Sequence, residues 1–287
     1  MVDYQSISKQ INMQLETKFS NTSLRIVSAF VLLGIIILAA SLGSWGLWSL
    51  TFVMGLLTIE EILSNLFKTQ RISLQYITAM IIFIIGYGLL FSFENYLSYF
   101  VLGGIAFNLA CLFYLFFNNI QSLNFIVKMQ KWSFIVGVFV LLLFSSLLWV
   151  FSQNNALKLM FFILIINSFV DIGGWFFGKL FGRRKLWPTI SPNKTINGTI
   201  GGVSTSVILS SVYSYLVLEK FNLIIFIMLI VLALVSQCGD LFQSKLKRQF
   251  EVKDSSNLIP GHGGIYDRID SLIFVIPFFA LMIMTLY

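Results

Sequence analysis

The sequence has few of the residues from which soluble proteins build charged surfaces, disulfides or zinc sites. Only 11% of its 287 residues are Asp, Glu, Lys or Arg, and it contains one His, two Cys and four Pro. Both cysteines, Cys111 and Cys238, fall within apolar runs, so we do not expect a disulfide between them. A lone His without a neighbouring Cys or second His makes a zinc site improbable. The longest polar connection, 244–268, is too short for a soluble domain.

Long apolar runs take the place of these residues. The chain is 57% hydrophobic and contains 30 Phe. Runs of about 20 apolar residues are long enough to cross a bilayer as helices, and nine occur: 25–42, 44–63, 72–91, 96–117, 132–151, 156–181, 199–218, 221–241 and 269–287. The pattern predicts an all-α polytopic membrane protein with about nine transmembrane helices. We expect a single integral membrane domain over 1–287, in which 1–155 supplies helices of unclear role and 156–287 the catalytic helices and loops.

The basic residues are distributed unevenly between the two ends of these runs. With the N-terminus in the cytoplasm, 17 of the 19 Lys and Arg fall on the cytoplasmic side, leaving Lys158 and Lys220 outside. This is the positive-inside pattern, and it accounts for most of the net charge of +7. We therefore predict no nucleic-acid partner, because a basic stripe with interleaved aromatics on a soluble face is missing. Both charge-rich loops, 179–198 and 244–268, are expected on the cytoplasmic side.

The segment 244–270 concentrates the polar chemistry of the chain. It holds five Lys or Arg, four carboxylates and the only histidine, His262. Ionisable clusters in a membrane protein are costly and usually functional. Carboxylate oxygens hold Mg²⁺, while Lys and Arg hold the phosphates that the metal bridges. Glycines such as those at 261–264 let backbone amides approach phosphate oxygens. These are the parts of a phosphoryl-transfer site, although His262 could equally form a structural hydrogen bond inside the turn.

Two upstream segments carry further polar residues. Asp171 precedes Gly174, Gly178 and Gly182, whose four-residue spacing predicts a face for close helix packing. A carboxylate within an apolar helix must pair with a cation, a metal or water, so Asp171 is either a structural ion pair or part of a site. The second segment, 188–195, contains two prolines and predicts an ordered turn. It suits either an anionic ligand or lipid headgroups.

Taken together, Ser244, 246–248, 253–254, 260–264 and 267–270 resemble the signature of the phosphatidate cytidylyltransferase family. The upstream pieces agree in order: Asp171 with its glycines, then 191–195, then Gly239-Asp240. The resemblance implies that CTP and phosphatidic acid give CDP-diacylglycerol and pyrophosphate, in the bilayer. It also implies a metal centre of Mg²⁺ with a second, monovalent cation such as K⁺. We further expect a multi-pass protein of the bacterial inner (plasma) membrane with its active site facing the cytoplasm, and a homodimer stays open.

The resemblance assigns roles residue by residue. Catalytic roles are expected for Asp240, Asp267, Lys247, Arg248, Lys253, His262 and Arg268, of which Asp240 and Asp267 are the metal ligands. Substrate-binding roles are expected for Asp171, Ser191, Lys194, Thr195, Asp254, Gly261, Gly263, Gly264 and Asp270. Acyl chains are expected to enter through a lateral opening lined by the sixth to ninth spans.

Three alternatives remain. The same CTP chemistry could act on another lipid phosphate, such as an unsaturated prenyl ether phosphate. An ion-coupled transporter could use Asp171 and Asp240, but the two halves show no inverted repeat of charged segments. An inactive member is suggested by Asn197, because the family usually has Glu there and Asn would weaken a cation contact. The chain also has Gly174 and Trp175 where the family tends to have Ala and an aromatic residue.

Overall fold

The structure, a computed structural model, describes the backbone of residues 4–92, 96–117 and 131–286, and their side chains except those of 4–22 and 91. Over these residues the chain forms nine α-helices, one π-helix and one two-stranded sheet. The elements are α1 (Tyr4–Ser41), α2 (Gly43–Glu60), the π-helix η1 (Glu61–Leu66), α3 (Leu74–Ser92), α4 (Leu97–Phe117), α6 (Ile135–Phe151), α7 (Ala156–Phe181), β1 (Lys185–Trp187), β2 (Ser191–Thr195), α8 (Ile196–Val217), α9 (Leu223–Gln249) and α10 (Asp270–Leu286).

Each of the nine apolar runs corresponds to one of these α-helices, which confirms the predicted all-α membrane fold. Six helices in the described part of the chain are long and apolar enough to cross a bilayer. The helices α3, α6 and α10 are apolar but shorter, so the number of nine spans stays a prediction. The small β1–β2 sheet was not predicted.

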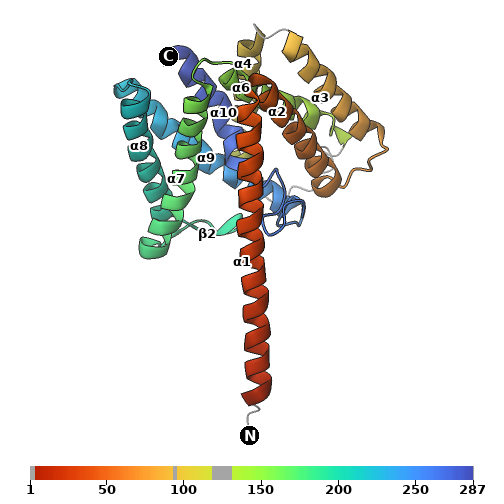
Figure 1. The fold of residues 1–287 in the computed structure, drawn as a ribbon, viewed down its shortest axis with the longest axis vertical. Helices are drawn as coiled ribbons and strands as arrows, with labels where there is room; N and C mark the ends of the chain where they lie inside the picture. Colours follow the sequence, from red (N-terminus) through yellow and green to blue (C-terminus); the bar gives the residue numbers. More distant parts are fainter. Residues whose placement is uncertain (1–3, 93–95, 118–130, 287) are drawn as a thin grey trace.

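Figure 1 shows that the polar segments gather at one end of the helical bundle. The N-terminal part of α1 projects from this end, where β2 and the loop between α9 and α10 also lie, while the C-terminus lies at the opposite end. The predicted topology places the N-terminus and both charged loops on one side, and the arrangement agrees with it. Which side faces the cytoplasm stays a prediction.

Glycine faces bring α7 and α8 into close contact, as the four-residue spacing predicted. A Cβ on Gly198 would lie 2.7 Å from the carbonyl oxygen of Gly174, and one on Gly202 would overlap the carbonyl oxygen of Val170. Only glycine lets the two backbones approach this closely. The packing fixes the hairpin β1–β2, which joins these helices, against α9.

A proline inside α10 is compensated by a buried side chain from α4. Pro277 has no N–H, so the carbonyl of Ile273 loses its helical partner. The fully buried Asn108 donates from Nδ2 to the carbonyl oxygens of Ile273 (3.4 Å) and Phe274 (3.2 Å). The two helices are thereby held in register beneath the polar end of the bundle.

Candidate functional site

The two prolines of 188–195 shape a hairpin that presents Lys194 to the helices. Strands β1 and β2 pair antiparallel, with Lys185 opposite Thr195 and Trp187 opposite Ser191. Thr195 is the N-cap of α8, and its Oγ1 accepts a hydrogen bond from the amide of Gly198 (3.1 Å). The predicted turn is thus confirmed, and it ends at the start of a helix, where backbone amides favour anions.

A cavity of about 220 Å³ lies between this hairpin and the helices α7, α8 and α9. Three predicted substrate-binding residues, Asp171, Lys194 and Thr195, line it together with Gly174 and Gly198. Asn193, Trp175 and Gln237 complete its polar and aromatic lining. The structure therefore brings the upstream segments of the sequence to one cavity.

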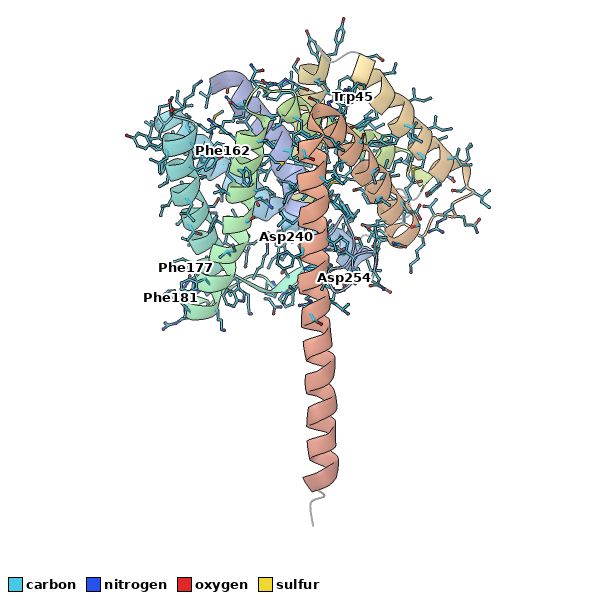
Figure 2. The ribbon with its side chains drawn as sticks, in the orientation of Figure 1. Trp45, Phe162, Phe177, Phe181, Asp240 and Asp254 are labelled. Atoms are coloured by element: carbon cyan, nitrogen blue, oxygen red, sulfur yellow. The ribbon has the colours of Figure 1, made fainter. Side chains whose placement is uncertain are left out.

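Lys194 connects the hairpin to α9 within this cavity. Its ammonium forms an ion pair with Asp240 and donates a hydrogen bond to Oε1 of Gln237 at 3.2 Å. Both side chains of the ion pair are about one-fifth exposed (22% and 23%), so the pair is partly screened by solvent but remains open to a ligand. Figure 2 shows Asp240 inside the outline of the bundle, while Asp254 lies on the polar segment at its end.

Three predicted aspartates from three helices face a common region. Asp171 of α7, Asp240 of α9 and Asp270 of α10 interact electrostatically with one another. Lys194, Lys247 and Arg268 interact with members of the same group. Like charges held together in this way need cations between them, so the region is suited to a divalent ion and to the phosphates that it carries.

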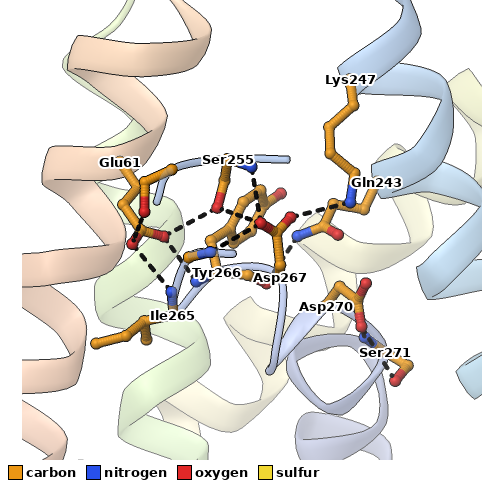
Figure 3. Close-up of polar contacts among 11 residues, drawn as sticks. Glu61, Gln243, Lys247, Ser255, Ile265, Tyr266, Asp267, Asp270 and Ser271 are labelled. Atoms are coloured by element: carbon orange, nitrogen blue, oxygen red, sulfur yellow. Dashed lines mark hydrogen bonds and ion pairs between the residues drawn. The ribbon is translucent and has the colours of Figure 1, made fainter. Parts of the chain in front are cut away.

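Asp267 organises the loop between α9 and α10 (Figure 3). Its Oδ2 accepts hydrogen bonds from the amides of Ser255 (2.7 Å) and Gly264 (3.0 Å) and from the Ser255 hydroxyl (3.0 Å). Its Oδ1 pairs with Nζ of Lys247 at 3.0 Å. Both members of that pair are largely buried, with side chains 4% and 12% exposed. Of the two oxygens, Oδ1 is the one with room for a metal, since it has a single partner here.

The environment of Asp267 favours its ionised form. Burial alone would raise the pKa of this carboxyl, but the Gly264 amide, the charge of Lys247 and the Ser255 amide together outweigh burial. The pKa of Asp267 is therefore lowered from its ordinary value. A negative charge at this point keeps Lys247 directed toward the loop.

A second carboxylate, Glu61, holds the same loop from the other side and was not predicted. It is 3% exposed at the first position of the π-helix η1. Its oxygens accept hydrogen bonds from the amides of Ile265 (2.9 Å) and Tyr266 (2.8 Å). They also accept from the hydroxyls of Ser256 (2.7 Å) and Ser255 (3.0 Å). The Ser255 hydroxyl contacts both carboxylates, so Asp267 holds the loop from within while Glu61 ties it to η1 (Figure 3).

The glycine turn is closed by its own backbone and by α1. Gly261 and Gly263 have φ of +74° and +85°, which favour glycine. The amides of His262 and Gly263 donate to the carbonyl of Ile259, and the amide of Gly264 donates to Asp267. These amides are used within the loop, so the predicted phosphate cradle would require them to exchange partners.

Two residues of α1 reach this turn. Arg25 donates from Nε to the carbonyl oxygen of Gly261 at 2.9 Å. The Ser28 hydroxyl lies 2.7 Å from Nδ1 of His262 and 3.2 Å from the carbonyl oxygen of Pro260. His262 thus makes the structural hydrogen bond that its sequence context allowed, and its catalytic role stays a prediction.

Several predicted residues take no part in these contacts. Arg248 is exposed in the last turn of α9, and Lys253 and Asp254 are exposed on the loop that follows. Ser191 is half-buried at the start of β2. Lys245, which lies between signature residues, is buried and donates to the carbonyl oxygens of Leu115 (2.9 Å) and Tyr114 (3.2 Å) in the last turn of α4. A cation at a helix C-terminus is stabilising, so Lys245 joins α9 to α4.

Asn197, the departure from the family pattern, contacts the end of α7. Its Nδ2 donates to the carbonyl oxygen of Phe181 at 2.6 Å. A glutamate could not donate this bond. The Asn therefore satisfies one of the carbonyls that the helix end leaves unpaired, which gives the substitution a structural reason.

The arrangement fits a magnesium ion carried in by a phosphate ligand. Among the described residues, no three His, Cys, Asp or Glu side chains lie close enough to form a metal cage by themselves. Mg²⁺ does not need one, because it is usually bound by one or two carboxylates together with substrate phosphates and water. Asp240, with Asp171 and Asp270 nearby, supplies such oxygens. Asp267 would contribute through Oδ1 only by sharing or releasing Lys247.

The sequence indicated the functional residues within the loop between α9 and α10. It did not indicate the residues outside this loop that hold it in place. The pair Glu60-Glu61 at the end of an apolar run was a usable signal, since charges at such positions are costly. Nothing in the spacing of Arg25, Ser28 or Gln237 pointed to the loop or the cavity, because each acts across a long sequence separation.

Comparison with known proteins supplies a family. The phosphatidate cytidylyltransferase of Staphylococcus haemolyticus (strain JCSC1435) is 43% identical over 135 residues, which are 46% of this chain and 51% of the relative. That of Staphylococcus aureus (strain COL) gives the same values, and that of Staphylococcus epidermidis (strain ATCC 35984) is 41% identical over 133 residues, again 46% and 51%. The chain spans about half the length of these curated relatives. A model described as the cytidylyltransferase family matches residues 23–286, so the chain belongs to the cytidylyltransferase family.

Proposed function

We propose that this protein is a phosphatidate cytidylyltransferase, which transfers CMP from CTP to phosphatidic acid and releases pyrophosphate. The observation that carries the proposal is the Lys194–Asp240 ion pair, which joins the hairpin to α9 at a cavity also lined by Asp171. Lys247, Arg268 and Asp270 interact with the same aspartates. Related proteins that carry the name of this activity support it.

The chemistry requires no protein nucleophile. An oxygen of the lipid phosphate attacks the α-phosphorus of CTP, the bond from that phosphorus to the bridging oxygen of the β-phosphate breaks, and pyrophosphate leaves with the electron pair. The obstacle is the meeting of two anions, which positioning and charge neutralisation must overcome. Lys194, Lys247 and Arg268 would neutralise phosphate oxygens. A bound Mg²⁺, held by Asp240 and Asp267 with Asp171 or Asp270 nearby, would supply further charge stabilisation. We include a second, monovalent cation in the proposal.

The apolar helices support a setting of the reaction in a bilayer. A lipid substrate can keep its acyl chains in the bilayer while its phosphate reaches the polar end of the bundle. We place the protein in the bacterial inner membrane with this end toward the cytoplasm, where nucleotides are found. We also propose that the protein forms a homodimer.

The test is a panel of lipid acceptors and nucleotides with the purified protein. CTP labelled in cytidine should give chloroform-soluble label with phosphatidic acid, and only with Mg²⁺ present. CTP labelled in the γ-phosphate should release its label as pyrophosphate. Label transfer to a prenyl ether phosphate but not to phosphatidic acid would assign another lipid phosphate. Transfer to no acceptor would overturn the proposal and favour an inactive member of the family.

A further inference from the structure

An apolar cavity lies next to the loop between α9 and α10, against helices of the N-terminal half of the chain. Its volume is about 320 Å³. The walls come from η1, α4, the start of α6, α9 and the loop. Its lining is almost wholly aromatic and aliphatic: Ile62, Phe67, Phe107, Tyr114, Phe139 and Leu246 are typical members.

Such a volume is large for an empty interior. Protein interiors are packed to crystal density, and a cavity of about 150 Å³ lined by apolar side chains already binds benzene. By that comparison the present cavity has room for roughly twelve carbon atoms. An apolar ligand of this size that is abundant around a membrane protein is one hydrocarbon chain of a lipid.

The cavity shares one wall with the loop that carries Asp267. Tyr266 and Leu246 line the cavity, and the residues that follow them, Asp267 and Lys247, form the buried ion pair of the loop. Phe242 also lines it, and the next residue, Gln243, donates to the carbonyl oxygen of Tyr266 at 2.8 Å. At each of these three points in the wall, one residue lines the cavity, and the next residue along the chain takes part in a hydrogen bond or ion pair of the loop.

Two lining residues of the cavity are exposed, one on α4 and one in the turn just before α6. Ala110 is exposed, and Trp132 is 52% exposed, although both line the cavity. Tryptophan is enriched where a bilayer meets water, and the exposure of Trp132 fits an opening near the headgroups of the lipids. The deeper lining residues Ile62, Phe139 and Tyr266 are each under 8% exposed.

From this shared wall we propose that the cavity binds an acyl chain of the phosphatidic acid substrate while its phosphate occupies the polar site; the inference rests on the proposed function. It gives η1, α4 and α6 a role in lipid selection. It also places the acyl site among these helices, whereas the sequence predicted a lateral opening lined by the sixth to ninth spans.

The test blocks the opening and measures chain-length preference. Ala110→Trp would fill the mouth, and Ala106→Trp is the matched control, because Ala106 is exposed one turn away on α4 and does not line the cavity. Substrates are dioctanoyl and dipalmitoyl phosphatidic acid at equal surface concentration in mixed micelles. We expect Ala110→Trp to lower kcat/KM for the dipalmitoyl substrate at least about tenfold, equivalent to losing the packing of about two methylenes. Its value for the dioctanoyl substrate should fall less, because a shorter chain loses less packing, and both values for the control should stay within about twofold.

A second measurement locates the chain without relying on a variant. Phosphatidic acid with a photoreactive diazirine near the end of one acyl chain is irradiated with the wild-type protein, and the labelled peptides are identified by mass spectrometry. Label on 107–114 or 132–139 supports the proposal, and label confined to α7 and α8 overturns it. An unchanged chain-length profile in Ala110→Trp also overturns it. A wild-type protein that transfers CMP to no phosphatidic acid refutes the proposed function itself.

Discussion

A substitution of Glu61 is the most direct test of how the loop between α9 and α10 is held in place. The perturbation is Glu61→Gln, which preserves the size of the side chain but replaces one carboxylate oxygen by an NH₂ group. Glu61 receives two amide and two hydroxyl hydrogen bonds from the loop. The hydroxyls of Ser255 and Ser256 can rotate to accept from the new NH₂, but the backbone amides cannot. Either orientation of Gln therefore leaves the amide of Ile265 or that of Tyr266 facing a donor.

The magnitude follows from that one lost contact. A buried donor left without an acceptor costs about 1–3 kcal/mol, and hydrogen bonds to a carboxylate are at the upper end of the usual range. We expect Glu61→Gln to destabilise the loop by about 2–3 kcal/mol. If catalysis requires the loop in place, this corresponds to a loss of about 30- to 150-fold in kcat/KM.

The matched control is Glu60→Gln, which removes the same charge one residue earlier. Glu60 contacts Arg71 and Tyr76 rather than the loop, and Arg71 is 73% exposed, so this ion pair contributes less than about 1 kcal/mol. Both variants are assayed for CMP transfer to phosphatidic acid and for thermal unfolding in detergent. Equal kcat/KM values for the two variants, at wild-type level, would refute the reasoning about Glu61.

Three further predictions follow from individual contacts. Gly264→Ala should abolish most activity, because its Cβ would overlap the Ser255 hydroxyl and the Glu61 carboxylate, whereas Gly34→Ala has open space and should leave the transfer rate unchanged. Because the folded pKa of Asp267 is lowered, its stabilisation is present above the ordinary pKa of about 3.8 and is lost as pH falls through the lowered value. The Tm of the wild type should therefore fall more than that of Asp267→Asn between pH 6 and about pH 3, and parallel curves would contradict this. Asn108→Leu should lower the free energy of unfolding by about 1–3 kcal/mol in a denaturant titration, since the Ile273 carbonyl freed by Pro277 loses its donor; an unchanged midpoint would contradict it.

The sequence was sufficient for the helices because their signal is local. Apolar runs long enough to cross a bilayer leave few alternatives to a helix, and the glycine spacing at 174 and 178 predicted the close approach of α7 to α8. The polar signature was equally readable, since it collects charges that an apolar chain would otherwise avoid. Asp171 and Lys194, which line one cavity, and Asp240, which pairs with Lys194, were therefore predicted from the sequence.

The contacts between the two halves of the chain could not be predicted. Glu61 binds a loop about 200 residues later, and Ser28 reaches His262 across 234 residues. Hydropathy shows only that such residues lie near the end of an apolar run. It does not indicate which residues they contact in the fold. The cavity behind Tyr266 was missed for the same reason, because its lining residues are ordinary apolar residues whose arrangement depends on how α4, α6 and α9 pack.

The central claim is that Asp240 and Lys194 form part of the site where CTP reacts with phosphatidic acid. The most direct measurement is transfer of cytidine-labelled CTP into phosphatidic acid by the wild type and by Asp240→Asn, over a range of Mg²⁺ concentrations, with Glu219→Gln as an exposed control on the α8–α9 connection. The account predicts Mg²⁺-dependent labelled lipid in the wild type and the control, and a loss of about 10³-fold in Asp240→Asn, typical of removing a group that stabilises transition-state charge. Equal transfer by Asp240→Asn at every Mg²⁺ concentration would contradict it.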